Sequence, residues 1–194
     1  GNADYRNHLG RYYDLVARDP AAALGHYRAA VALNPHSARF WFDLASAYQV
    51  LGDTVAQTAA LEHAIQADSM TPDVAWEAAN LYLVQGENDK ALREFRVVMA
   101  NDISLTPTAA QFCWRIKPDV DALLRDVIPQ NAEAYLAFLT LLQLKGETAG
   151  TFKVWNALLR TSQPFARHYV YDYVRFLIQQ KEVDRAAAVW QQTA

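Results

Sequence analysis

The sequence predicts an all-α fold of stacked helix pairs, and two patterns support this. Five sets of residues recur every 34 positions between residue 3 and about residue 104. Prolines and glycines stand where the helices of such an array would begin and end. The recurring sets are Tyr48 and Tyr82; Gly52 and Gly86; Ala23, Gln57 and Ala91; Tyr27, Leu61 and Phe95; and Ala30, Ala64 and Val98. A fixed period of this length is typical of a helical array in which neighbouring repeats bury each other's apolar faces.

The helix starts follow from the prolines. A proline at the first helical position costs nothing, because the N–H group that it lacks has no partner there. Such pairs are Asp19-Pro20, Thr71-Pro72, Thr106-Pro107 and Gln163-Pro164. We expect helices at 3–17, 20–33, 38–51, 54–68, 72–85, 88–101, 107–115, 118–127, 131–145, 148–161, 165–180 and 183–192, with no strands.

The turns inside the repeats follow from glycines that can adopt a left-handed conformation after a helix. These are Gly52, Gly86 and Gly146, and Lys181 stands at the matching place in the last repeat. Aligning Gly146 with Gly86 recovers a degenerate repeat over 131–163, and aligning Lys181 in the same way recovers another over 164–194.

The predicted organisation is one solenoid domain over residues 1–194. Its regular repeats occupy about 4–37, 38–71 and 72–105. Residues 106–130 are too few for a standard pair, and Lys117-Pro118-Asp119 interrupts them, so we expect a short, irregular fourth pair there.

The middle copy, Trp41-x-x-Leu44-Ala45-x-x-Tyr48, together with Ala91-x-x-x-Phe95 and the closing Pro35, resembles the tetratricopeptide repeat (TPR) family. This resemblance implies a right-handed superhelix of about six helix pairs, whose concave side is lined by the first helix of each pair. It also implies that the chain binds a peptide or a partner protein.

The resemblance places a binding surface on the first-helix face that follows i, i+3, i+4 and i+7 spacing. The expected groove residues are Tyr5, His8, Tyr12, Arg39, Phe42, Ser46, Gln49, Asp73, Trp76, Asn80, Leu83 and Trp114, with Arg115, Tyr171 and Arg175 less securely in phase. Aromatic and amide side chains of this kind suit an extended peptide. The alternative is that Trp76 and Tyr12 pack against adjacent first helices.

The other three tryptophans, Trp41, Trp155 and Trp190, occupy packing columns, and we expect them in the core. The last predicted helix carries Ala186, Val189 and Trp190 without a polar outer face. An array usually ends in a polar cap. The pattern therefore favours a chain cut from a longer protein, or a terminal helix covered by self-association with another copy.

Chaperone-binding members of the family hold a carboxylate with lysine, asparagine and arginine side chains on three successive first helices. The matching places here hold His8, Tyr12, Asp43, Asp73 and Glu77. Because acids stand where the basic residues would be, we do not expect a clamp for a chaperone tail.

Composition excludes several other function classes. The net charge of -3 does not suit nucleic-acid binding, and no apolar run is long enough for a membrane span. A single cysteine, Cys113, excludes an internal disulfide and leaves the cellular compartment undecided. No histidine pair has the spacing of a helical zinc site, and Cys113 is expected to act as a small hydrophobe. We therefore expect no catalytic residue, metal or cofactor.

Three functional classes remain open from the sequence. The first is a non-catalytic scaffold for a protein or peptide ligand. The second is an assembly module of a longer multidomain protein, which concentration-dependent mass in solution would reveal. The third is a groove for carbohydrate or another small ligand, because exposed tryptophans also stack on sugar rings.

Overall fold

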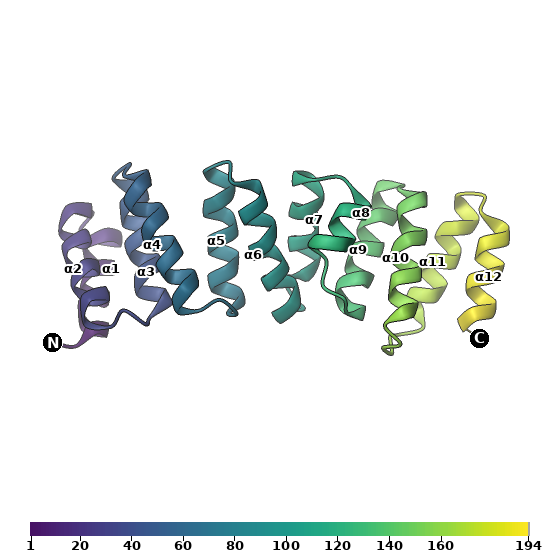
Figure 1. Ribbon diagram of the computed structural model, residues 1–194, viewed down its shortest axis with the longest axis horizontal. Helices are drawn as coiled ribbons and strands as arrows, with labels where there is room; N and C mark the ends of the chain where they lie inside the picture. The colour runs from purple at the N-terminus through teal and green to yellow at the C-terminus, as the bar shows by residue number, and fades with distance from the viewer. Residues whose placement is uncertain (194) are drawn as a thin grey trace. The chain divides into compact units, whose positions relative to one another are not determined.

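The computed structural model describes residues 1–193, which form twelve helices and no strand (Figure 1). The helices are α1 (Ala3–Leu15), α2 (Pro20–Leu33), α3 (Ala38–Val50), α4 (Thr54–Ala67), α5 (Pro72–Val84), α6 (Asn88–Asn101), α7 (Thr106–Ile116), α8 (Val120–Asp126), α9 (Ala132–Lys145), α10 (Thr148–Arg160), α11 (His168–Gln179) and α12 (Val183–Thr193). The predicted all-α class and helix order are confirmed.

The chain divides into two compact units, which are described separately: unit 1, Gly1–Glu87, and unit 2, Asn88–Ala194. Unit 1 contains α1 to α5 and unit 2 contains α6 to α12. The predicted organisation as one solenoid with six repeats stays a prediction.

The recurring apolar columns are the core positions of both units. Every member of the three sets that begin at Ala23, Tyr27 and Ala30 is buried, including the polar Gln57. Small residues at helix crossings allow close approach, and large ones fill the spaces beside them. The 34-residue period therefore marks the interior of the fold.

The turns between paired helices have the predicted geometry. Gly52, Gly86 and Gly146 all have φ between 71° and 77°, in the left-handed region. Lys181, which takes the glycine's place in the last repeat, is also left-handed with φ of 64°. After Gly52, the carboxylate of Asp53 caps α4 by accepting a hydrogen bond from the backbone N–H of Ala56 at 3.0 Å.

Unit 2 contains the irregular pair, as the sequence predicts. Its second helix, α8, has only 7 residues. The short helix packs on α10 at Gly150, where a Cβ atom would lie 2.8 Å from a methyl group of Val120. The absence of a side chain at Gly150 thus allows α10 to lie close to the start of α8.

Unit 2 differs from the expectations at one helix start and at one tryptophan. The helix predicted to start at residue 165 begins at His168, because Ser162 is left-handed with φ of 54° and the following residues form a loop. Trp190 is not in the core and is 48% exposed. Its ring lies 5.6 Å from that of Tyr171.

Candidate functional site

The predicted groove residues of unit 1 lie on the first helices α1, α3 and α5. Phe42 is buried, and Trp76, Asn80 and Leu83 are half-buried. The exposed members are Tyr5, His8, Tyr12, Arg39, Ser46, Gln49 and Asp73. The half-buried Trp76 leaves both alternatives for this residue open, since one part of its side chain packs and another part meets solvent.

The structure brings Arg39, Phe42 and Asp73 together around a small cavity of about 80 Å³, which Asp43 and Glu77 also line. Partial burial raises the pKa of Glu77, and the neighbouring carboxylate of Asp43 raises it further, while Arg39 opposes the shift. Three acids, Asp43, Asp73 and Glu77, therefore share one cavity.

Two side-chain amides of unit 1 form hydrogen bonds to other groups of the protein. The side-chain amide of Asn80 donates to the backbone oxygen of Trp76 at 2.8 Å, one turn earlier in α5. The buried Asn7 donates to the carboxylate of Asp43 at 2.7 Å. Asn7 thereby orients Asp43 at the cavity.

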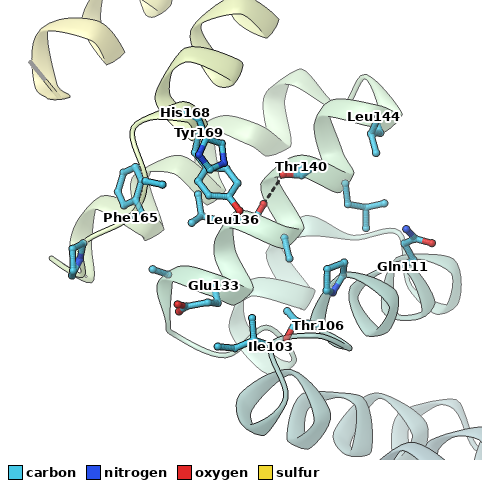
Figure 2. Close-up of a pocket in the computed structure, with 16 residues that line it drawn as sticks. Ile103, Thr106, Gln111, Glu133, Leu136, Thr140, Leu144, Phe165, His168 and Tyr169 are labelled. Carbon is cyan, nitrogen blue, oxygen red and sulfur yellow. Dashed lines mark hydrogen bonds between the residues drawn. The ribbon is translucent and has the colours of Figure 1, made fainter.

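A much larger groove lies in unit 2, with a volume of about 740 Å³. It is formed by α7, by one face of α9 and by residues 164–169, which run into α11 (Figure 2). Its lining residues are Ile103, Thr106, Pro107, Gln111, Ala132, Glu133, Leu136, Ala137, Thr140, Leu141, Leu144, Pro164, Phe165, Ala166, His168 and Tyr169. None of them was among the predicted site residues.

The face of α9 in the groove follows helical spacing. Glu133, Ala137, Leu141 and Leu144 succeed one another at intervals of three or four residues, so they share one side of the helix. Leu144 is 78% exposed. Residues 131–145 are apolar on nearly every side, so the sequence did not show which face would remain open.

The opposite wall is the loop before α11, and two contacts hold it. The side-chain oxygen of Gln163 accepts a hydrogen bond from the backbone N–H of Ala132 at 2.7 Å, which ties the loop to the start of α9. The ring of Phe165 packs edge-on against Trp155, with 5.8 Å between centroids. Trp155 is in the core, as predicted.

The groove is apolar with a few polar groups at its edge. The hydroxyl of Thr140 is used inside α9, where it donates to the backbone oxygen of Leu136 at 2.9 Å (Figure 2). The buried Thr106 hydroxyl likewise donates to the oxygen of Asp102 at 2.8 Å. Gln111, Glu133 and His168 are exposed and can meet a ligand. This composition, an apolar cavity with few polar groups, is typical of a binding site.

The predicted site residues of unit 2 lie elsewhere. Trp114 is half-buried, and its ring lies 6.2 Å from that of Phe138. The guanidinium of Arg115 lies 5.8 Å from the centre of the Phe112 ring. Arg175 forms an ion pair with Asp172. Trp114 is therefore partly exposed, but it does not line the large groove.

The side chains of Cys113 and His63 take part in packing. Cys113 is fully buried, and desolvation raises its pKa to about 12, so the thiol behaves as the small hydrophobe that the sequence predicts. The ring of His63 stacks on that of half-buried Trp41 at 4.4 Å.

Within residues 1–193, no group of three or more histidine, cysteine or acidic side chains could hold a metal ion. No helix of the described part is long and apolar enough to cross a bilayer.

Comparison with known proteins gives a family match over part of the chain. Residues 12–69 match the family model described as tetratricopeptide repeat. No curated protein matches the sequence. Similar solved structures include a tetratricopeptide repeat protein from Parabacteroides merdae, with 16% identity, a TM-score of 0.49, and coverage of 98% of this chain and 78% of that one.

Two further structures have comparable scores. The pilF protein of Pseudomonas aeruginosa has 16% identity and a TM-score of 0.45, with 98% of this chain and 89% of that one covered. The P58(IPK) TPR domain has 16% identity and a TM-score of 0.46, with 98% of this chain and 59% of that one covered.

Proposed function

Because residues 12–69 of this chain match the tetratricopeptide repeat model, we propose that it is a non-catalytic scaffold that binds a peptide segment of a partner protein. Arrays of this type usually bind proteins or peptides along their first helices. The observation that carries the proposal is the apolar groove of about 740 Å³ between α7, α9 and the loop before α11.

The groove suits bulky apolar side chains of a ligand. Ile103 and Leu144 are 69% and 78% exposed, so a bound segment would cover apolar surface that is now in water. Glu133, Gln111 and His168 stand at the edge, where they can pair with polar groups of the ligand. A few buried anchors surrounded by polar contacts are the usual source of binding energy.

The predicted surface of unit 1 is proposed as a second contact area for the same kind of ligand. The aromatic side chains of Tyr5 and Tyr12 are more than half exposed on α1. Exposed tyrosines supply rigid contact area at low cost in conformational entropy. Trp76 and Asn80 on α5 complete this surface.

Charged substitutions in the groove should abolish peptide binding without unfolding the protein. Peptides selected by the wild-type chain from a random phage-displayed library would be measured by fluorescence polarisation. We expect the double substitution Ile103→Glu and Leu144→Glu to weaken binding at least about tenfold, because each carboxylate must lose water when an apolar side chain enters. Both residues are exposed, so folding should be unaffected.

The control is Val55→Glu, which places one carboxylate on an exposed apolar residue of α4, outside both surfaces. A second variant, Trp76→Ala with Asn80→Ala, tests the unit 1 surface alone. A library that yields no enriched peptide, or peptides bound equally by all variants, would contradict the scaffold.

A second candidate function is self-assembly through α11 and α12. The aromatic rings of Tyr171 and Trp190 lie 5.6 Å apart and are about half exposed, beside a cavity of about 160 Å³. Exposed adjoining apolar side chains are typical of an interface.

If this surface mediates assembly, the mass measured by sedimentation should rise with protein concentration. The double substitution Tyr171→Ser and Trp190→Ser should keep the chain monomeric, since it removes most of the apolar area. A wild-type mass that is monomeric and constant up to high concentration would exclude this candidate.

A further inference from the structure

A third cleft, of about 550 Å³, lies in unit 2 between α6, α8 and the segment that joins α7 to α8. Four cationic side chains line it: Arg93, Arg96, Lys117 and Arg125. Only two acids, Asp89 and Asp126, lie in the same lining. The whole chain, in contrast, has 21 acidic and 18 basic residues. Positive charge is therefore concentrated here in an otherwise acidic protein.

One cation of the cleft is neutralised inside the protein. The guanidinium of Arg125 donates to both carboxylate oxygens of Asp126, at 2.9 and 2.8 Å. This pairing holds the pKa of Asp126 below its usual range, and Lys117 contributes to the shift. Arg96 reaches the backbone oxygen of Asp126 at 3.5 Å. Asp126 therefore interacts with three of the four cations, but its single negative charge neutralises only one positive charge.

Arg93, Arg96 and Lys117 keep most of their charge unbalanced. Among the described residues, none of the three forms an ion pair within 4.0 Å. All three are exposed, so water reaches them, and the charge of Arg93 opposes the rise that burial causes in the pKa of Glu94. Cations that converge from separate segments repel one another, and an anion between them relieves that repulsion.

We propose that this cleft binds an acidic segment of a partner protein, with Arg93, Arg96 and Lys117 contacting its carboxylates. Guanidinium groups match the planar geometry of carboxylates, and such charge-assisted hydrogen bonds are among the strongest in proteins. The three cations come from α6 and from the segment that joins α7 to α8, so they lie on separate parts of the cleft wall. This spread suits several negative charges on an extended chain better than one small ion.

The test uses a fluorescein-labelled hexaglutamate peptide and fluorescence polarisation. We expect binding that weakens strongly between about 50 mM and about 300 mM NaCl, because salt screens exposed charges. The double substitution Arg93→Gln and Lys117→Gln should weaken binding at least about tenfold. The control is Lys145→Gln with Arg160→Gln, two exposed cations of unit 2 outside the cleft, which should change affinity by no more than about twofold.

Equal weakening by the cleft variant and its control would overturn the proposal, since net charge alone would then explain binding. Complete displacement of the peptide by millimolar inorganic phosphate would overturn it too, because a small oxyanion would then be the ligand. The groove variant Ile103→Glu with Leu144→Glu should leave hexaglutamate binding unchanged. The acidic-segment site and the apolar groove are thereby tested independently.

Discussion

Replacing Ala64 with arginine is expected to abolish cooperative unfolding of unit 1. Ala64 lies in α4 and is fully buried, in the column that also holds Ala30. An arginine there must enter a helix crossing or force the helices apart. Burying an unpaired charge costs several kcal/mol, which is a large share of the roughly 5–15 kcal/mol that stabilise a typical domain.

The measurement is urea unfolding followed by circular dichroism, with Ala59→Arg as the control. Ala59 is exposed on the same helix, so that substitution should alter the free energy of unfolding by no more than about 0.5 kcal/mol. A sigmoidal transition for Ala64→Arg with a midpoint close to that of the wild type would show that the column position is not a tight crossing.

The success of the sequence prediction in the regular repeats has a physical cause. Positions 34 residues apart repeat the same local environment, so Ala64 could be placed in the core from its counterparts Ala30 and Val98 alone. The left-handed glycines fixed the turns, because few other residues adopt that conformation at low cost. At Lys181 the alignment of the repeats predicted the turn better than the residue type did, because this lysine adopts the left-handed conformation although it is not a glycine.

Where the period fails, tertiary contacts decided the outcome. Pro164 indicated a helix start, but Ser162 turns the chain and the side chain of Gln163 binds the start of α9, so the segment became a loop. Trp190 stands in a packing column, yet about half of it is exposed. Column position predicts burial only where a neighbouring repeat supplies the other half of the contact.

The candidate site was the least predictable part. The exposed tyrosines of α1 follow from helix periodicity, whereas the groove of unit 2 depends on the loop formed by residues 164–166. A sequence pattern describes faces of single helices, but a groove needs two walls whose separation is set by packing. The sequence did not indicate the cationic cleft for the same reason, because Arg93, Lys117 and Arg125 come from separate segments that only the fold brings together.

A single methyl group at Gly10 should destabilise the protein although alanine favours helices. A Cβ atom at this position would lie 2.6 Å from two carbon atoms of the Tyr27 ring, which is buried between α1 and its neighbours. Overpacking of this kind costs about 1–3 kcal/mol. The gain of up to about 1 kcal/mol in helix propensity does not offset it. Gly10→Ala should therefore lower the midpoint of urea unfolding.

The matched control is Gly25→Ala in α2, where a Cβ atom meets nothing within 4 Å. The same chemical change should there raise stability by roughly 0.5–1 kcal/mol, so the two substitutions are expected to have opposite signs. Tyr27→Leu should relieve part of the clash, and the two changes at 10 and 27 should couple by about 1 kcal/mol or more. If both alanines stabilise the protein, α1 and α2 are not in close contact at Gly10, and the small residues at these crossings do not determine how the first repeat packs.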